Sequence, residues 1–360
     1  MHPLSTGAKE LYSEELSHLN SLRKNGLRTG AVACRAFPPA VLAGLGVRPV
    51  RIPVDVSGEE NNSVTNLVRQ DVCPLVGELL GEIQSDCSDF AVGMHTCDMT
   101  RRLFQESKRF STIPVHQIQL PATKGDASLR FFTSQVDRIS RDLTGNGFSS
   151  GYNCSTAEDW YRSTLEAAVF LRSKAETIPP VALQYMLHLF RIADPSTLKD
   201  KMQELLGSSE PYHPKFTLLL TGSPVALGDN IVAETVETMG GALIPLNCTG
   251  FQMFPDQPGK LEDFSVAALC RIYFESMKCV RCRPNHETFR YAAEELISTG
   301  AHGLIVKTLK FCDLWFTEKV RMKQAFQVPV LLLDTAFSVG EVERTAARVE
   351  SFVQSLEDHE

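Results

Sequence analysis

Short apolar segments alternate with helical segments along two stretches of the chain. In the first stretch, the apolar segments lie at residues 31–33, 50–54, 90–92 and 115–120. Between them, segments such as residues 76–83 repeat apolar side chains every three or four positions, as amphipathic helices do. Strands separated by helices of this length form βαβ units with a parallel sheet. The first 150 residues are therefore predicted to form an α/β domain.

The same alternation returns in the last third of the chain. Strands are expected at residues 216–220, 242–245, 303–306 and 328–333, with helices between them. Breaks rich in Gly, Ser or Pro at residues 144–151 and 207–211 enclose three amphipathic helices without a credible strand. The expected fold is α/β, with two Rossmann-like parallel-sheet domains and an inserted helical segment. The expected boundaries are 1–150, 151–211 and 212–360.

Charge and hydropathy exclude several classes of partner. The chain has 36 Lys and Arg against 43 Asp and Glu, a net charge of −7, and no basic block. It is therefore a poor candidate for binding the phosphate backbone of nucleic acid. No stretch approaches the roughly 20 apolar residues of a membrane span, and the first residues contain no apolar signal region. We expect a cytoplasmic protein whose partners include neither nucleic acid nor membrane.

The positions of the cysteines indicate a site. A reduced cytoplasmic chain has little need of disulfides, yet this one has ten cysteines. Cys97 and Cys312 each follow an expected strand and precede Asp and a helix, and Cys34 and Cys248 also follow strands. Cys73 comes just before a helix, whose N-terminal amides favour a thiolate. Since parallel sheets bind ligands at the carboxyl ends of their strands, converging thiolates favour an iron–sulfur cluster or a soft metal.

Zinc is the competing interpretation. Cys279 and Cys282 form a C-x-x-C pair, with His286 four residues further on. A closed four-coordinate zinc site of the finger type needs a second such pair, and the sequence has none at suitable spacing. The sequence also lacks the phosphate loop GxxxxGK[ST], so we do not expect the chain to hydrolyse ATP itself.

Taken in order, these motifs resemble a known superfamily from about Gly30 to Leu356. It comprises the 2-hydroxyacyl-CoA dehydratase subunits, the benzoyl-CoA reductase subunits and the double-cubane cluster proteins. The matching stretches are Cys34 with Phe37-Pro38-Pro39, Asp71-Val-Cys73-Pro74, Thr96-Cys97-Asp98, Leu219 to Pro224, Asn247-Cys-Thr-Gly250, Cys282 with Pro284-Asn285, Gly303 to Asp313, and Val330 to Asp334 with Arg348 to Phe352.

The resemblance implies a cofactor and partners. It implies a [4Fe-4S] cluster between two α/β domains, with Cys73, Cys97 and Cys312 at the positions of the cluster ligands. Three protein thiolates leave one iron open to a substrate oxygen or a small ligand. It further implies a homodimer or a heterodimer with a sister subunit, and a separate ATP-dependent iron–sulfur activator protein that injects an electron. For the dehydratases, the resemblance implies an acyl-CoA substrate that loses water through a ketyl radical.

The subfamily depends on the remaining cysteines. Lys310-Phe-Cys312-Asp313 resembles the dehydratase and benzoyl-CoA reductase subunits. Further cysteines (Cys34, Cys87, Cys248 and Cys282) match those that hold the [8Fe-9S] cluster of double-cubane proteins, although the C-x-x-C replaces a tighter pair and the stretch from Cys87 to Cys97 is shorter. We favour a dehydratase-type cluster subunit. The alternatives are a double-cubane reductase of small molecules or a benzoyl-CoA reductase-like subunit, and a non-catalytic cluster-binding relative.

One histidine is a candidate catalytic residue. His95 lies two residues before Cys97. It is placed to donate to a cluster sulfur or to protonate a leaving group. The alternative is that His95 is a packing residue with a satisfied ring.

Overall fold

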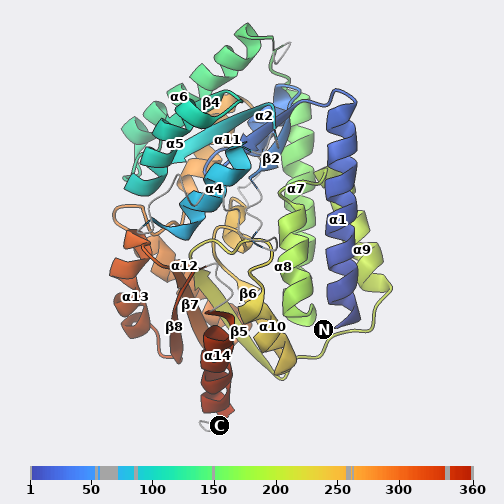
Figure 1. Ribbon diagram of the computed structural model, residues 1–360, viewed down its shortest axis with the longest axis vertical. Coiled ribbons are helices and arrows are strands. Elements are labelled where there is room, and N and C mark those ends of the chain that lie inside the picture. The colour runs from blue at the N-terminus through green and yellow to red at the C-terminus, as the bar shows by residue number, and fades with distance from the viewer. Residues whose placement is uncertain are drawn as a thin grey trace.

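The first sheet contains only parallel pairings. The computed structural model describes residues 2–52, 56, 72–84, 88–147, 151–256, 261, 263–336 and 341–357. Within these ranges the strands follow the order β2-β1-β3-β4 (Figure 1). Residues 53–54 of the strand expected at 50–54 lie outside the described ranges. The elements are β1 (Thr29–Val32), α2 (Pro39–Gly44), β2 (Arg48–Arg51), α4 (Pro74–Gln84), β3 (Phe90–His95), α5 (Asp98–Phe110), β4 (Val115–Gln119) and α6 (Asp126–Gly145).

The second sheet repeats the topology of the first. Its described strands pair in the order β6-β5-β7-β8, again all parallel. The expected α/β fold with two Rossmann-like parallel-sheet domains is therefore confirmed. The elements are β5 (Phe216–Gly222), α10 (Ile231–Thr238), β6 (Gly241–Pro245), the 3-10 turn η2 (Phe251–Met253), α11 (Val266–Glu275), α12 (His286–Thr299), β7 (Gly303–Leu309), α13 (Asp313–Ala325), β8 (Val330–Thr335) and α14 (Val342–Glu357).

A group of helices lies beside both domains (Figure 1). The central helix is α8, and every one of its side chains is buried. An N-terminal helix that the sequence analysis did not predict, α1, packs against it, although Leu4, Ala8, Tyr12 and Leu19 recur at helical spacing. None of the helices in the described ranges combines the length and apolar character of a membrane span. The group consists of α1 (Pro3–Lys24), α7 (Cys154–Lys174), η1 (Ala175–Thr177), α8 (Pro180–Leu189) and α9 (Pro195–Gly207).

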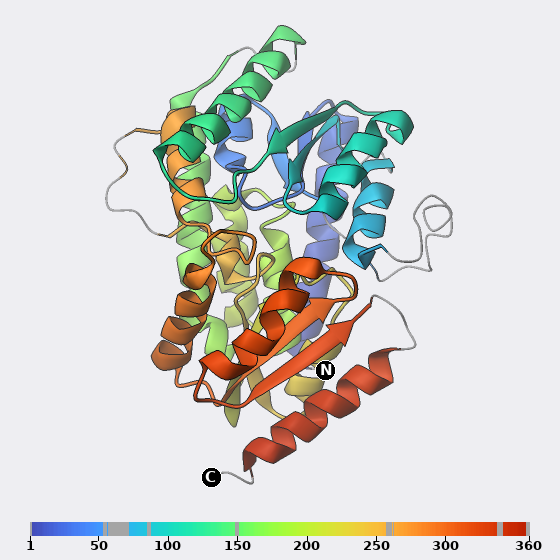
Figure 2. The same ribbon diagram turned by 90° about the vertical axis from the view of Figure 1, so that its left-hand side faces the viewer.

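The chain returns to the first domain after β6. Helix α11 follows the first strands of the second sheet, yet it packs against α6 of the first domain (Figure 2). The rings of Phe132 on α6 and Phe274 on α11 stack with their centroids 5.5 Å apart. The loop from α11 to α12 therefore starts at the first domain and ends at the second.

Arg281 fixes this loop on the first sheet. Its guanidinium donates to the carbonyl oxygens of Pro121 at 2.7 Å, Leu120 at 2.5 Å and Thr96 at 3.3 Å. These carbonyls follow β3 and β4, and the Arg281 side chain is buried. Hydrogen bonds from a charged donor are among the stronger ones, so Arg281 holds the loop against the carboxyl ends of two strands.

Replacing Arg281 should loosen this attachment. Arg281→Ala leaves three carbonyls without their donor, and we expect the free energy of unfolding of the apoprotein to fall by about 2–4 kcal/mol. Urea denaturation followed by circular dichroism measures it. The control is Arg271→Ala on α11, which removes an exposed pair with Glu275 and should cost less than about 1 kcal/mol. Equal effects of the two substitutions would contradict the assignment.

Candidate metal centre

A cavity of about 160 Å³ lies where the carboxyl ends of the two sheets meet. In each sheet the order of the strands reverses direction between the two central strands: the chain adds one outer strand beside the first central strand and the other outer strand beside the second. The central strands are β1 and β3 in the first sheet and β5 and β7 in the second. Such reversal points are where parallel α/β sheets bind ligands. Residues that follow all four central strands line the cavity, among them Cys34, Cys97, Pro224 and Cys312. The repeated topology thus directs two binding edges at one space.

Six cysteines line this cavity. They are Cys34, Cys73, Cys97, Cys248, Cys279 and Cys312, and none of them forms a disulfide. Their effects on one another's pKa divide them into two groups. We call Cys73, Cys97 and Cys312 the first triad, and Cys34, Cys248 and Cys279 the second triad. Each triad takes cysteines from both halves of the chain.

Each thiol of the first triad stands at the N-terminus of a helix. Cys73 directly precedes α4, Cys97 is the N-cap of α5, and Cys312 is the N-cap of α13. The sulfur of Cys97 accepts from the amide of Thr100 at 3.5 Å. Helix N-termini carry partial positive charge and unpaired amides, which favour a negatively charged sulfur. The three helices therefore provide a setting for anionic sulfur from three directions.

The turn after β5 brings a hydroxyl to the first triad. Gly222 has φ of +121°, and a Cβ there would lie 1.9 Å from the carbonyl oxygen of Lys307. Only glycine allows this approach. The next residue, Ser223, then donates its amide to Lys307 and accepts from the amide of Leu309 at 3.0 Å. The side chain of Ser223 also hydrogen-bonds Cys312, where it acts to lower the pKa of the thiol.

Burial favours the neutral thiol at two members of the first triad, Cys73 and Cys312, in the metal-free protein. Burial is the largest cause that raises the pKa of Cys73 to about 12, and Cys312 and Cys97 raise it further. The amides of Leu75 and Val76 act in the opposite direction. Burial likewise raises the pKa of Cys312. A bound cation is what such thiols need to become thiolates, because metal binding displaces the proton.

The second triad is assembled from three separate loops. Cys34 follows β1, Cys248 follows β6, and Cys279 belongs to the loop that Arg281 fixes on the first sheet. Burial raises the pKa of Cys279 to about 12, and Cys282, Cys34 and Cys248 raise it further. Burial also raises the pKa of Cys248, which the charge of Arg51 opposes. Burial therefore favours the neutral thiol at Cys248 and Cys279, too, in the metal-free protein.

The residues fit an iron–sulfur centre better than a single ion. The lining is mainly apolar, and its sulfur donors are the ligands that iron–sulfur clusters use. Within the described ranges, no three His, Cys, Asp or Glu side chains are arranged around one metal ion. Among the described residues, Cys279, Cys282 and His286 do not form a group that could hold a metal ion. Cys279 lines the cavity, Cys282 is buried in a hydrophobic core, and His286 contacts Glu287.

Comparisons with known proteins identify the family of this chain. A family model described as 2-hydroxyglutaryl-CoA dehydratase, D-component, matches residues 34–356. The chain belongs to this family. It is also 20% identical over 374 residues to an Escherichia coli (strain K12) protein named "Putative dehydratase subunit YjiM", covering 93% of each chain. The resemblance stated from the sequence is confirmed, and membership of a dehydratase family implies an enzyme subunit.

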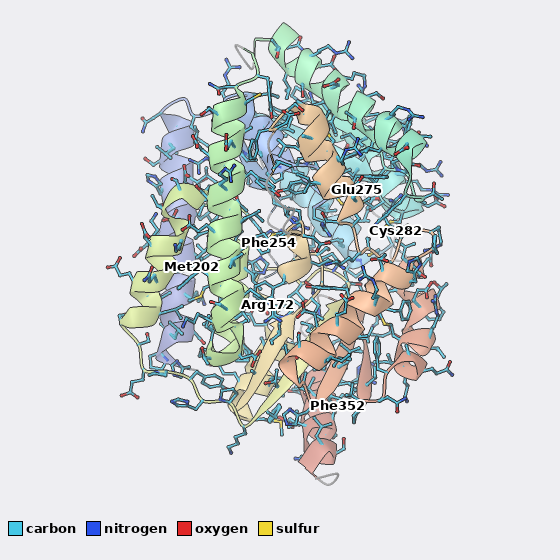
Figure 3. The ribbon with its side chains drawn as sticks, turned by 180° about the vertical axis from the view of Figure 1, so that it is seen from behind. Arg172, Met202, Phe254, Glu275, Cys282 and Phe352 are labelled. Carbon is cyan, nitrogen blue, oxygen red and sulfur yellow. The ribbon has the colours of Figure 1, made fainter. Side chains whose placement is uncertain are left out.

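Not all of the predicted cluster ligands of this D-component family member line the cavity. Cys73, Cys97, Cys312, Cys34 and Cys248 all line the cavity. Cys282 does not line it, since its side chain is buried among apolar residues beside α11 (Figure 3). Its neighbour in the C-x-x-C pair, Cys279, lines the cavity instead. The C-x-x-C pair in the sequence indicated that a cysteine of this loop belongs to the site. The spacing of the pair does not tell which of its two cysteines faces the cavity. Cys87 lies outside the described residues.

His95 stands apart from the cavity wall. It is the last residue of β3, and its Nε2 lies 3.1 Å from Oε1 of Gln117 on β4. Gln117 in turn donates to the carbonyl oxygen of Phe104 at 2.5 Å. His95 is not among the residues that line the cavity. Its role as a proton donor stays a prediction, while its contact with Gln117 links two strands.

The raised pKa of Cys73 predicts slow alkylation of the metal-free protein. At pH 8 a thiol of pKa about 12 is ~10⁻⁴ ionised, against roughly a quarter for an unperturbed thiol of pKa about 8.5. Iodoacetamide labelling with peptide mass spectrometry should show Cys73 reacting at least about 10³-fold more slowly in the folded than in the urea-unfolded protein. The folded rate should keep rising with pH above 9. Equal rates in both states would show that Cys73 is not protected.

Proposed function

We propose that this chain is the iron–sulfur subunit of a 2-hydroxyacyl-CoA dehydratase-type enzyme. The observation that carries the proposal is the first triad, in which three thiols from both domains stand at helix N-termini around one apolar cavity. Cys73, Cys97 and Cys312 would hold a [4Fe-4S] cluster. When bound, it would supply a low-potential electron and one iron with an open coordination position.

The cavity residues supply a dry site for radical chemistry. Apolar side chains such as Val76, Phe104, Val225 and Trp315 line it. Excluding water strengthens electrostatic interactions and protects reactive intermediates. The overall reaction would convert a 2-hydroxyacyl-CoA into the 2-enoyl-CoA and water through a ketyl radical. The electron that starts it would be recovered at the end, so that the reaction needs no net reductant.

The electron would come from another protein. The sequence has no phosphate loop, so ATP hydrolysis would belong to a separate iron–sulfur activator protein. The chain would work as a homodimer or with a sister subunit, in the cytoplasm. The leaving hydroxyl needs a proton, for which His95 is the candidate from the sequence. Thr100 also lines the cavity, but its hydroxyl already donates to the carbonyl oxygen of Cys97 at 3.0 Å.

The iron content of variants tests the first triad. After anaerobic purification, the wild type should contain about four irons and four sulfides for each cluster of this type. Cys97→Ser should lose the cluster of the first triad and all water-eliminating activity with the activator and ATP. The control is Cys154→Ser at the exposed start of α7, which should keep both. Full iron content in Cys97→Ser would contradict the proposed ligand set.

A second candidate function is favoured by the second triad. Cys34, Cys248 and Cys279 line the same cavity as the first triad, which gives six thiols for an [8Fe-9S] double-cubane centre. The cavity volume of about 160 Å³ is also below the ~300–1,000 Å³ that encloses a drug-sized ligand. Both observations suit an ATP-dependent reductase of small molecules. The benzoyl-CoA reductase-like and non-catalytic alternatives have no comparable support.

Removing one thiol from the second triad distinguishes the two functions. A double-cubane reductase should contain about eight irons, and Cys248→Ser should lose about half of them. A dehydratase with one cluster should contain about four, and the same substitution should leave them in place. The assay with activator and ATP then decides the chemistry. Formation of an enoyl-CoA identifies the dehydratase, and electron consumption by small acceptors without water elimination identifies the reductase.

A further inference from the structure

The charged side chains around the cavity all have the same sign. Arg35, Arg51, Arg191 and Arg281 line it, and among its described lining residues there is no Asp, Glu, Lys or His. Burying a cation away from water is costly unless an opposite charge or strong acceptors compensate. In a cavity without carboxylates, that compensation must come from carbonyl oxygens, from sulfur or from what the cavity binds.

Backbone carbonyl oxygens compensate the positive charge of two of the four arginines. Arg281 donates to the three carbonyls that follow β3 and β4. Arg191 donates to the carbonyl oxygen of Ile52, and its Nη1 lies 2.8 Å from Nδ1 of His188. Both side chains therefore have structural roles in holding neighbouring segments together. The remaining two arginines need another explanation.

Arg35 and Arg51 are incompletely paired. Arg35 is 5% exposed, and among the described residues its two terminal nitrogens hydrogen-bond only the carbonyl oxygen of Ser276, at 3.3 and 3.4 Å. Its Nε is buried and has no hydrogen-bond partner among the described residues. The Nη1 atom of Arg51 is also buried, and it too has no hydrogen-bond partner among the described residues. Two guanidinium groups thus present unused N–H donors inside the molecule.

Both arginines face the second triad. Burial lowers the pKa of Arg35, and the cysteines Cys34, Cys279 and Cys248 raise it. Arg51 acts by charge and by a hydrogen bond to lower the pKa of Cys248. Cys34 is also the sequence neighbour of Arg35. Arg35 and Arg51 line the same cavity as the three cysteines that would become negative on binding a cluster.

We propose that Arg35 and Arg51 are the counter-cations of an iron–sulfur centre held by Cys34, Cys248 and Cys279, and that they set its reduction potential. The inference rests on the second candidate function, in which the second triad also holds part of an iron–sulfur centre. Three thiolates and inorganic sulfide carry negative charge, and each added electron increases it. Hydrogen bonds to the sulfurs and nearby charge are established determinants of cluster potentials. The two arginines are thus positioning residues that favour the reduced state.

Arg35 also forms part of the wall between this cavity and a second one. The second cavity, open to solvent, is lined by Arg35 together with Arg172 of α7, Phe254 and Lys278 (Figure 3). Its other cations are paired, Arg172 with Glu295 and Lys278 with Asp256 at 2.5 Å. Variants of Arg35 must therefore keep the bulk of the side chain, so that a change in potential is not caused by added solvent.

Redox titration of the anaerobically reconstituted protein tests the proposal. Arg35→Gln and Arg51→Gln remove the charge and keep much of the length, whereas Arg35→Lys and Arg51→Lys keep the charge. When the reduced cluster is followed by electron paramagnetic resonance, the midpoint potential of each Gln variant should be more negative than that of the wild type. We expect at least a tenfold loss in the equilibrium constant for one-electron reduction, which corresponds to 59 mV. The Lys variants should recover part of it, and Arg271→Gln on the exposed side of α11 should match the wild type.

The outcomes separate this inference from the proposed function. Loss of the second-triad iron from a Gln variant, with retention in its Lys counterpart, also supports the charge role. An unchanged midpoint in both Gln variants overturns it. If the wild type holds about four irons that depend on Cys97 and not on Cys248, the cluster subunit stands and the counter-cation role fails. If the reconstituted wild type binds no iron, the proposed function itself fails.

Discussion

The charge inside one cavity constrains this molecule more than any other interaction. Six thiols and four guanidinium groups line an apolar space that has no carboxylate among its described residues. Burial raises the pKa of four of these thiols, those of Cys73, Cys248, Cys279 and Cys312. Among the described residues, Nε of Arg35 and Nη1 of Arg51 are buried without a hydrogen-bond partner. The proposed anionic centre with iron would satisfy both sets, since thiolates need a cation and the arginines need an anion.

The repeated topology brings these groups together. Both sheets have the same parallel strand order, and each directs the carboxyl ends of its central strands at the cavity. Cys97 and Cys312 occupy equivalent places, after β3 and β7, as N-caps of the helices that follow. The internal repeat therefore predicts a site at the junction of the domains. The D-component family, matched from residue 34 to 356, includes both halves.

Much of the fold was predictable from local pattern. Strands such as β3 and β5 and helices such as α6 follow from short apolar segments and helical periodicity, because these signals depend on neighbours in the sequence. Two features were not predicted. Helix α1 was missed, although its apolar residues have helical spacing. The packing of α11 on α6 could not be inferred, because it depends on Phe132 and Phe274 meeting across a long separation in sequence.

The sequence by itself determined the fold class, the family and five of the six cysteines that line the cavity, since strand ends and helix starts are local signals. Tertiary structure decided how the cysteines divide into two triads and that Cys279, rather than Cys282, faces the cavity. It also decided that Arg35 and Arg51 lie beside the second triad. The physical reason is that the direction of a side chain in a loop is set by distant contacts. Here they are the hydrogen bonds from Arg281 to three carbonyls of the first sheet.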